Sequence, residues 1–353
     1  MAILFADGFD HYGTASTSNT NLSTVYTFPS GALGYLCTAE TTQSRTGVCS
    51  LRWAGYGWGI MRSLTSAKTK LGQAGWFRIT TSKLVGLFSF NGTGNNSQIG
   101  IWRGLDGAVY ASRADDSSVY GTTDTNIFPT GAWVHVAAWV EAGSSPSATD
   151  GKVIIRIGGA SGGITVTCNN VDTLTGSNTN YVSCTAMQSD LGSQQDFYLD
   201  DFVINDDSGS YNNAIMDAYR AYAIYPNADT SGNDFVPASG FGYDNIDNVP
   251  PADSSSYIQS DTVADVSDFG VEDPSYALSS IAGVVVHSRM LTASSASVRV
   301  SCEKNGSVTA GSVHTLSGSG TYYQDVFERN PDGNAAWIYS TVGDSKIRFT
   351  RTA

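Results

Sequence analysis

Short runs in which apolar and polar residues alternate recur along the first two thirds of the chain. An alternation with a period of two is typical of strands that bury one face. Turn-forming residues separate the runs at intervals of roughly 8 to 12 residues, a spacing that indicates a β-sandwich or jelly roll. The predicted strands cover residues 3–12, 48–53, 74–79, 85–90, 98–102, 109–113, 133–140 and 152–157.

The run WVHVAAWV at residues 133–140 is apolar on both faces and therefore predicts a central strand. Its alternation places Trp133, His135, Ala137 and Trp139 on one side. A lone histidine among apolar neighbours is typical of a hydrogen-bonded core or strand-end group, and we prefer that interpretation of His135 to a ligand or a base.

Residues 196–226 form the stretch around which the rest is organised. Two strand-like runs, 197–204 and 216–225, flank a polar loop and predict the closing hairpin of the sandwich. The second run also fits a three-turn helix by propensity, because it contains Ala and Met. Its three tyrosines favour a strand, and Pro226 ends either element.

Beyond Pro226 the pattern changes. Residues 227–256 are rich in Gly, Pro, Ser and Asp, which predicts a linker between domains. Strand patterns resume at 257–353, with Asn305-Gly306 as a hairpin turn like that predicted at residues 105–108. The chain is thus predicted to be all-β, with a sandwich at 1–226, a linker at 227–256 and a small antiparallel β domain at 257–353.

The charge composition of the chain argues against some classes of binding partner. The chain has 353 residues, of which 19 are Lys or Arg and 32 are Asp or Glu, giving a net charge of -13. Phosphate binding needs a basic face, so this balance argues against a nucleic-acid or anionic-membrane partner. No apolar run reaches membrane-spanning length, and the short apolar start lacks the basic flank of a signal peptide.

The five cysteines show neither a CxxC motif nor paired histidine ligands, which argues against a zinc site. Cys37 with Cys49, or Cys168 with Cys184, can lie across neighbouring strands. We favour buried, unpaired thiols in a protein made in a reducing cytoplasm.

Several motifs resemble known proteins when taken in order. The opening LFADGFDHYG, the strand GAWVHV followed by DGKVIIRIGG, and the late FYLDDFVINDDSG resemble the concanavalin A-like, laminin-G-like jelly roll. The order of DGFDHYG, DDFVINDDSGSYNN, AYAIYP, SSSYI, VVVHSRM and NPDGNAAW resembles a family of tailed-bacteriophage virion proteins, over roughly 330 residues. The resemblance also favours a strand at 216–225.

This resemblance implies a non-enzymatic structural protein on the virion surface, made in the cytoplasm of the bacterial host. It would be a capsid-decoration or tail-surface subunit that forms homo-oligomeric contacts and binds other virion proteins. The chain shows no heptads, collagen-like glycine period or repeats, which argues against a long fibre shaft.

Glycoside hydrolysis is the least favoured function. It needs two carboxylic groups that flank the scissile bond, and glucanases of the resembled fold carry an ExDxE pattern. The predicted sandwich contains only Glu40 and Glu141, neither in that pattern. Asp196, Asp200 and Asp201 lie close in sequence, but paired aspartates at a strand edge are more often turn or cap residues. No GxSxG elbow or phosphate loop occurs.

A glycan-binding phage adhesin that recognises a host-surface sugar is the alternative function. Aromatic faces stack on pyranose rings, while carboxylate and amide groups hold hydroxyls. The competing interpretation is that the tryptophans fill the core. The candidate residues are Tyr56, Trp58 and Trp102, with Asp115, Asp116 and Asn170 on loops.

Four acids form the candidate metal site. In jelly rolls of the resembled type the first and a late strand are neighbours, which places Asp7 and Asp10 beside Asp200 and Asp201. We expect Asp7 and Asp200 to accept hydrogen bonds from turn amides and the other two to face water. The alternative is a structural Ca²⁺ clamp, with Asp206-Asp207 or Asp115-Asp116 as further sources of oxygen ligands. No other cofactor is expected.

Overall fold

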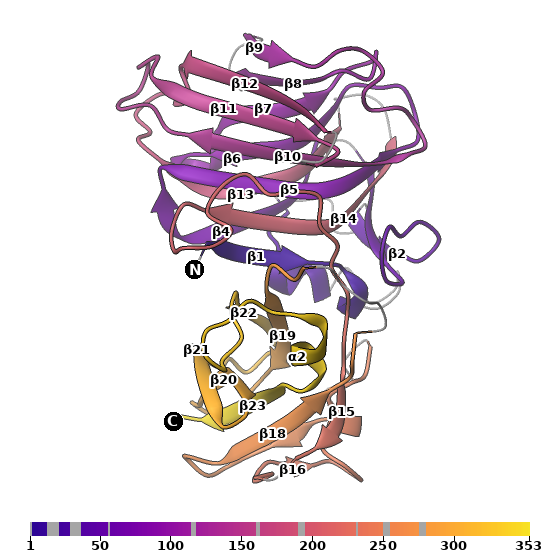
Figure 1. Cartoon of the computed structure of the whole chain (residues 1–353), viewed down its shortest axis with the longest axis vertical. Helices are drawn as coiled ribbons and strands as arrows, with labels where there is room; N and C mark the ends of the chain where they lie inside the picture. Colours follow the sequence, from indigo (N-terminus) through magenta and orange to yellow (C-terminus); the bar gives the residue numbers. More distant parts are fainter. Residues whose placement is uncertain are drawn as a thin grey trace. The chain divides into compact units, whose positions relative to one another are not determined.

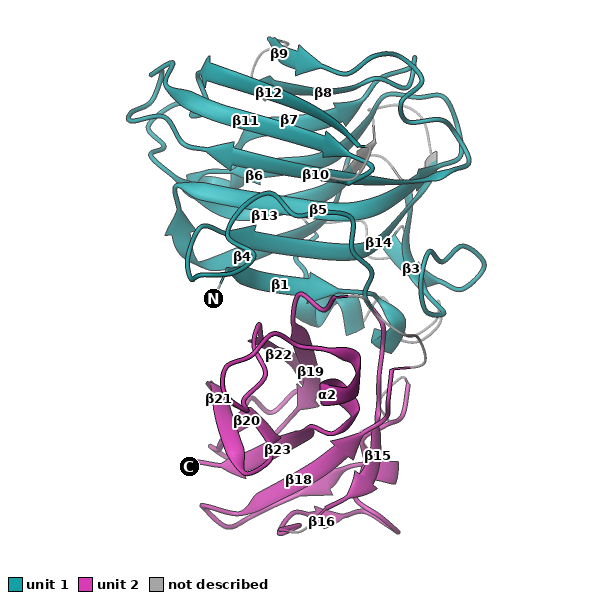
Figure 2. Cartoon of the chain, viewed as in Figure 1, with its two compact units in different colours: residues 1–221 teal, residues 222–353 magenta. Residues whose placement is uncertain are grey.

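The computed structural model describes residues 2–12, 21–28, 37–55, 57–113, 118–159, 163–189, 195–230, 232–249, 255–274 and 280–353. The chain divides into two compact units, Met1–Ala221 and Tyr222–Ala353 (Figure 2). Each is described separately below.

Unit 1 is a sandwich in which two antiparallel sheets are stacked face to face as two layers (Figure 1). We call them sheet one and sheet two. In spatial order, sheet one contains β12 (Ile164–Val171), β11 (Gly151–Ile157), β10 (Trp133–Glu141), β5 (Lys70–Ile79), β14 (Gln195–Asp206), β3 (Ser50–Gly55) and β2 (Cys37–Glu40), and β1 (Ile3–Asp7) also pairs with β14. Sheet two contains β4 (Gly57–Lys68), β13 (Tyr181–Ser189), β6 (Val85–Asn91), β7 (Ser97–Arg103), β8 (Val109–Arg113) and β9 (Val119–Thr122).

The core of unit 1 lies between the sheets and is rich in aromatic side chains. Phe77 of sheet one meets Phe88 of sheet two edge to face, with ring centroids 5.1 Å apart. Phe90 meets Tyr181 in the same way at 6.0 Å, and all four side chains are at most 1% exposed. Burying each large apolar side chain contributes about 1.5–3 kcal/mol, so these inward positions hold the sheets together.

Helical structure is minor in the described residues. The short 3₁₀ turns are η1 (Asp10–Tyr12), η2 (Thr93–Asn95) and η3 (Tyr243–Asn245), and α2 (Tyr339–Gly343) is a single α-helical turn. In the part of the chain that the structure describes, no helix has the length and apolar character needed to cross a membrane. The all-β fold class, a jelly-roll sandwich followed by a smaller antiparallel β unit, is confirmed.

The predicted turns are confirmed by backbone geometry. Asn305 and Gly306 have φ values of 50° and 82° and join β20 (Ser297–Lys304) to β21 (Ser307–Thr315). Two positive φ angles are what a type I′ hairpin turn requires, and Asn-Gly adopts them readily. At the β7–β8 turn, Gly107 has a φ of 78°.

The prediction of a closing hairpin at residues 196–226 is correct for its first strand and wrong for its second. β14 confirms its first strand, but residues 216–225 are neither strand nor helix, and the next strand is β15 (Pro226–Asp229) in unit 2. The reason lies in the partners of this backbone. Side chains of sheet one, among them Trp76 and Asp201, bond it, so no neighbouring strand is needed.

Unit 2 contains a sheet with the order β15, β18 (Val266–Val271), β23 (Lys346–Arg351), β20 and β21. Two further antiparallel pairs are β16 (Val236–Pro237) with β17 (Ile258–Gln259), and β19 (Val284–Met290) with β22 (Thr321–Phe327). Its own core includes Val300, Cys302, Phe327 and Trp337. The buried Trp337 indole donates its N–H to the carbonyl of Phe327 at 2.7 Å.

The described residues of the predicted linker, 227–256, belong to unit 2. β15 pairs with β18, and the Asp229 carboxylate accepts the amides of Gly242 and Tyr243 at 2.8 Å each. The Pro, Gly and Asp residues that suggested a linker therefore form turns within a folded unit, because an aspartate that accepts two loop amides fixes that loop.

Candidate functional site

The candidate site lies where β1 and β14 meet. The two strands pair antiparallel, with Asp7 opposite Phe202, so the first and a late strand are neighbours as expected. The predicted strand at 3–12 is shorter than expected, because β1 ends at Asp7 and η1 begins at Asp10. Phe9 between them has a φ of 62°, and the Asp7 carboxylate accepts its amide at 2.7 Å, which stabilises this unusual conformation.

Asp7 is a buried acceptor in unit 1. Besides the amide of Phe9, its carboxylate accepts the hydroxyls of Tyr12 and Tyr26 at 2.7 Å each. Burial raises the pKa of Tyr26 well above its ordinary value, and the Asp7 charge adds to the effect. Asp7 therefore serves to fix the backbone turn and two tyrosines.

Asp10 and Asp200 hold one loop, residues 45–49, from two sides. Asp10 Oδ1 accepts the amides of Val48 and Cys49 at 2.7 and 2.8 Å. Asp200 Oδ2 accepts the amides at 45 and 46 at 2.7 and 3.2 Å. Gly47 has a φ of 58°, and a Cβ there would lie 2.0 Å from Asp10 Oδ2, so the loop can approach Asp10 only with glycine at this position.

Asp201 lies in a bulge of β14 with a φ of 53°, next to Asp200. Its Oδ1 accepts the Thr46 hydroxyl at 2.6 Å and the Ala221 amide at 2.7 Å. Its Oδ2 is buried and has no hydrogen-bond partner among the described residues. When Asp201 is protonated, we therefore expect the proton on Oδ2, because Oδ1 accepts two hydrogen bonds.

The three acids that bond the loop 45–49, namely Asp10, Asp200 and Asp201, have raised pKa values. Burial raises the pKa of Asp10 to about 6, although the amides of Cys49 and Val48 act in the opposite direction. Burial also raises the pKa of Asp200, with the adjacent Asp201 as the next cause, and burial raises the pKa of Asp201. Desolvation disfavours the charged form, so these carboxyls hold their protons at higher pH than exposed ones.

The expectations for these acids are partly right. Asp7 and Asp200 accept turn amides, as predicted. The prediction that Asp10 and Asp201 face water is wrong, because they are only 3% and 0% exposed and accept hydrogen bonds themselves.

The geometry gives no support for a cation clamp. In the described part of the chain, no three of the four acids bring ligand atoms within 4.8 Å of one another, and each carboxylate already accepts at least one amide or hydroxyl. Asp206 instead pairs with Lys68 at 2.7 Å, and Asp207 lies 3.9 Å from Lys70. Asp115 and Asp116 lie outside the described residues.

The glycan candidates are not brought together as one group. Tyr56, Asp115 and Asp116 lie outside the described residues, as does the side chain of Trp58, whose backbone belongs to β4. Asn170 is exposed on β12 of sheet one, whereas Trp102 lies on β7 of sheet two.

Trp102 belongs to an aromatic pair on the outer face of sheet two. Ile99 and Ile101 of the same strand are fully buried, so alternation turns Trp102 away from the core, contrary to the core-filling interpretation. A Cβ at Gly100 would lie 2.3 Å from the Trp102 indole nitrogen, so the ring lies over that glycine. Tyr110 of β8 lies directly opposite Trp102, and both side chains are half-buried.

His135 is a second unusual group and lies on the outer face of sheet one. It is 0% exposed, and neither ring nitrogen has a hydrogen-bond partner in the described residues, so the prediction of a hydrogen-bonded histidine is wrong. Its ring lies 5.4 Å from Trp76 and 5.8 Å from Tyr219. Burial, helped by the Arg156 charge, lowers its pKa to about 3.

The five cysteines are buried and unpaired, as predicted. Burial raises the pKa of Cys37 and Cys184 far above the ordinary thiol value. Such thiols are packing groups rather than nucleophiles.

Comparison with known proteins gives a likeness of fold only. No protein-family model and no curated protein matches the chain. Among solved structures, an alginate lyase of polysaccharide lyase family 14 from Aplysia kurodai is 15% identical, with 58% of this chain and 99% of that one covered and a TM-score of 0.41. The catalytic domain of a glycoside hydrolase family 131 protein from Coprinopsis cinerea is 10% identical over 58% and 95%, with a TM-score of 0.37. A Bacillus subtilis protein of unknown function with a galectin-like fold is 6% identical over 58% and 96%, also at 0.37. Values this low transfer no activity.

Proposed function

We propose that the chain is a non-enzymatic structural subunit on the surface of a tailed-phage virion, which assembles by protein contacts as a capsid-decoration or tail-surface protein. The observation that carries the proposal is the state of the acidic cluster. Asp7, Asp10, Asp200 and Asp201 are buried and hold backbone amides and hydroxyls. A catalytic carboxyl must reach its substrate, and these four serve the fold instead. The order of motifs that resembles that of tailed-phage virion proteins supports the same proposal.

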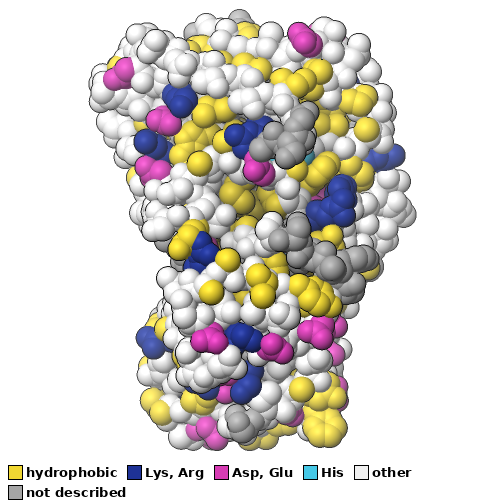
Figure 3. Space-filling model, viewed as in Figure 1, with side chains coloured by type: hydrophobic (Ala, Val, Ile, Leu, Met, Phe, Trp, Pro, Cys, Tyr) yellow, Lys and Arg dark blue, Asp and Glu magenta, His cyan; other side chains and the backbone are white. Residues whose placement is uncertain are grey.

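Unit 2 offers a surface suited to such contacts. β21 is an edge strand of its sheet, and Val308 and Val313 on it are 45% and 47% exposed. Edge strands present main-chain groups and side chains to other chains. Part of this edge already has a hydrogen-bond partner, because the Ser312 amide of β21 donates to Asp325 at 2.7 Å. Apolar side chains are also scattered over the face shown in Figure 3.

The copy number of the chain in purified particles, measured by quantitative mass spectrometry, tests the proposal directly. In solution, light scattering should show a homo-oligomer for the wild type and a monomer for the double variant Val308→Lys and Val313→Lys. Leu105→Lys, at an exposed turn of unit 1, is the matched control and should leave the oligomer intact. A wild-type monomer that is absent from particles would overturn the proposal, as would sugar release lost in Asp200→Asn.

A second candidate function, a glycan-binding adhesin, is favoured by the Trp102 and Tyr110 pair. Two adjacent aromatic side chains on an outer sheet face suit stacking against sugar rings. On a glycan array, saturable binding to one sugar class should fall at least about tenfold in Trp102→Ala, the loss expected for about 1.4 kcal/mol. Trp133→Ala, on the other sheet, is the control. Equal binding by both variants would exclude this site.

A further inference from the structure

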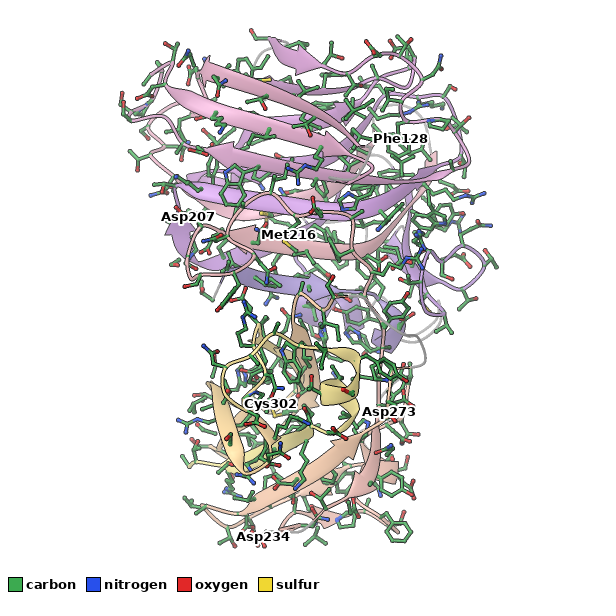
Figure 4. All side chains as sticks on the ribbon, viewed as in Figure 1. Phe128, Asp207, Met216, Asp234, Asp273 and Cys302 are labelled. Carbon is green, nitrogen blue, oxygen red and sulfur yellow. The ribbon has the colours of Figure 1, made fainter. Side chains whose placement is uncertain are left out.

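Residues 214–221 cross the outer face of sheet one as a strap, clearly visible in front of β14 and β5 in Figure 1. The strap begins where Asn205 Nδ2 donates to the carbonyl of Ala214 at 2.7 Å. Met216, labelled in Figure 4, lies over the sheet and is 8% exposed. The strap thus packs on the sheet without belonging to it.

Side chains of the sheet fasten the strap. Arg156 Nη1 lies 2.5 Å from Asp217 Oδ1, and Trp76 Nε1 donates to the carbonyl of Tyr219 at 2.7 Å. The Tyr219 hydroxyl donates to the carbonyls of Ala74, at 2.9 Å, and Asp201. The strap, residues 214–221, is not a strand and does not pair with sheet one. It can therefore leave the sheet without breaking a strand ladder.

The sheet face beside these fastenings carries His135. Trp76 and His135 are opposite each other on β5 and β10, and the next pair on the same face, Ala74 and Ala137, is fully buried. The Tyr219 ring meets the imidazole edge to face. His135 consequently packs against aromatic and apolar side chains, and neither of its nitrogens has a hydrogen-bond partner among the described residues. Such a group gains solvation when its cover leaves.

We propose that residues 214–221 are an acid-sensitive latch: protonation of His135 releases the strap from sheet one and exposes the Trp76 and His135 face. The closed strap accommodates only the neutral imidazole, because His135 is 0% exposed and a charged ring would find no acceptor among the described residues. The open form accepts both, so acid favours the open form.

Most of the charges around His135 disfavour a protonated imidazole while the strap is closed. Arg156 on β11 opposes a positive imidazole, and its partner on the strap is Asp217. Arg45 stacks on Trp76, 4.3 Å from the ring centroid, and adds positive charge. Asp200 and Asp201 on β14 have raised pKa values, so most of their protonation precedes that of His135. A protonated Asp201 can still accept the Ala221 amide through Oδ1.

The sign of the pH dependence follows. The pKa of His135 is lowered to about 3 in the closed form, and about 6.5 is ordinary for an exposed histidine. Its contribution to closure is fully present above pH 6.5 and is lost as pH falls toward 3. One proton changes the ratio of open to closed forms by up to about tenfold per pH unit in that window.

Hydrogen exchange of the full chain, read by mass spectrometry, tests the latch. After correction for intrinsic rates, protection of strap peptides that contain the Ala221 amide, which donates to Asp201 Oδ1, should fall up to about a hundredfold from pH 6.5 to 4.5, while β10 keeps its protection. His135→Phe should abolish this pH response, and His314→Phe in unit 2 should not. The proposal would be overturned if the strap changed its protection with pH in the same way as β10. It would also be overturned if the strap were unprotected at every pH.

Tyr219→Phe provides a test that does not depend on changing the buried histidine. It removes the hydroxyl that bonds the carbonyls of Ala74 and Asp201, and should raise strap exchange at least about tenfold at pH 7. Tyr257→Phe, an exposed tyrosine of unit 2, is the control. Unchanged strap exchange in Tyr219→Phe would show that these bonds do not hold the strap.

Discussion

Buried aspartates in unit 1 act as acceptors for loops rather than as reactive groups. Asp10 and Asp200 satisfy four backbone amides of the loop 45–49, which would otherwise lack partners at the sheet edge. The bonds from Thr46 and Cys49 are buried, and each unpaired buried amide costs about 1–3 kcal/mol, so the carboxyls offset a penalty of that order for these two amides. The remaining cost is electrostatic, since their charged forms are desolvated.

At the residue scale we predict that Asp201→Asn makes stability less dependent on pH. Burial raises the pKa of Asp201 in the folded state above its ordinary value. The contribution to stability is therefore fully present below about pH 4 and is lost as pH rises through the folded pKa. Asparagine keeps the Oδ1 acceptor for Thr46 and Ala221 and cannot ionise.

The measurement is urea unfolding at pH 5 and pH 8. The wild type should lose about 1 kcal/mol or more between the two values because of this group, and Asp201→Asn should lose less. The absolute stability of the variant is not the readout, because its amide group is itself buried. Asp207→Asn, on an exposed side chain, should behave like the wild type. An identical fall in all three proteins would contradict the prediction.

At the element scale, local alternation located most strands of unit 1 because each buries one face in the sandwich. β8 and β10 follow the predicted runs closely. The run at 216–225 was misassigned for a physical reason. Its partners, Trp76, Arg156 and Asp201, lie up to 143 residues from it in sequence, and no local pattern encodes them.

The candidate site shows the same limit of local patterns. The pairing of β1 with β14 was expected from the resemblance, but the burial of Asp10 and Asp201 depends on a loop at 45–49 that had no motif of its own. Tyr110 was missed, although the predicted turn at 105–108 sets the hairpin register that places it opposite Trp102. That register could have identified the pair.

At the scale of the whole molecule, the net charge of -13 governs how the protein responds to ions. A polyanion is stabilised by any divalent cation through screening, so a rise in melting temperature with Ca²⁺ alone does not demonstrate a site. A specific clamp at Asp7, Asp10, Asp200 and Asp201 would instead give Ca²⁺ an advantage over Mg²⁺, which prefers shorter, octahedral coordination.

We predict that the melting temperature is the same in Ca²⁺ and in Mg²⁺ at equal millimolar concentration, and that a chelator at matched ionic strength has no effect. The reason is that each of the four carboxylates already accepts at least one amide or hydroxyl within the fold. A site filled at a hundred times its Kd would add about 2.7 kcal/mol, which for a unit of this size raises the melting temperature by about 5 °C or more. Differential scanning calorimetry resolves such a shift. An excess of that size for Ca²⁺, lost in Asp10→Asn but kept in Asp207→Asn, would establish the clamp and contradict the structural role argued for these acids.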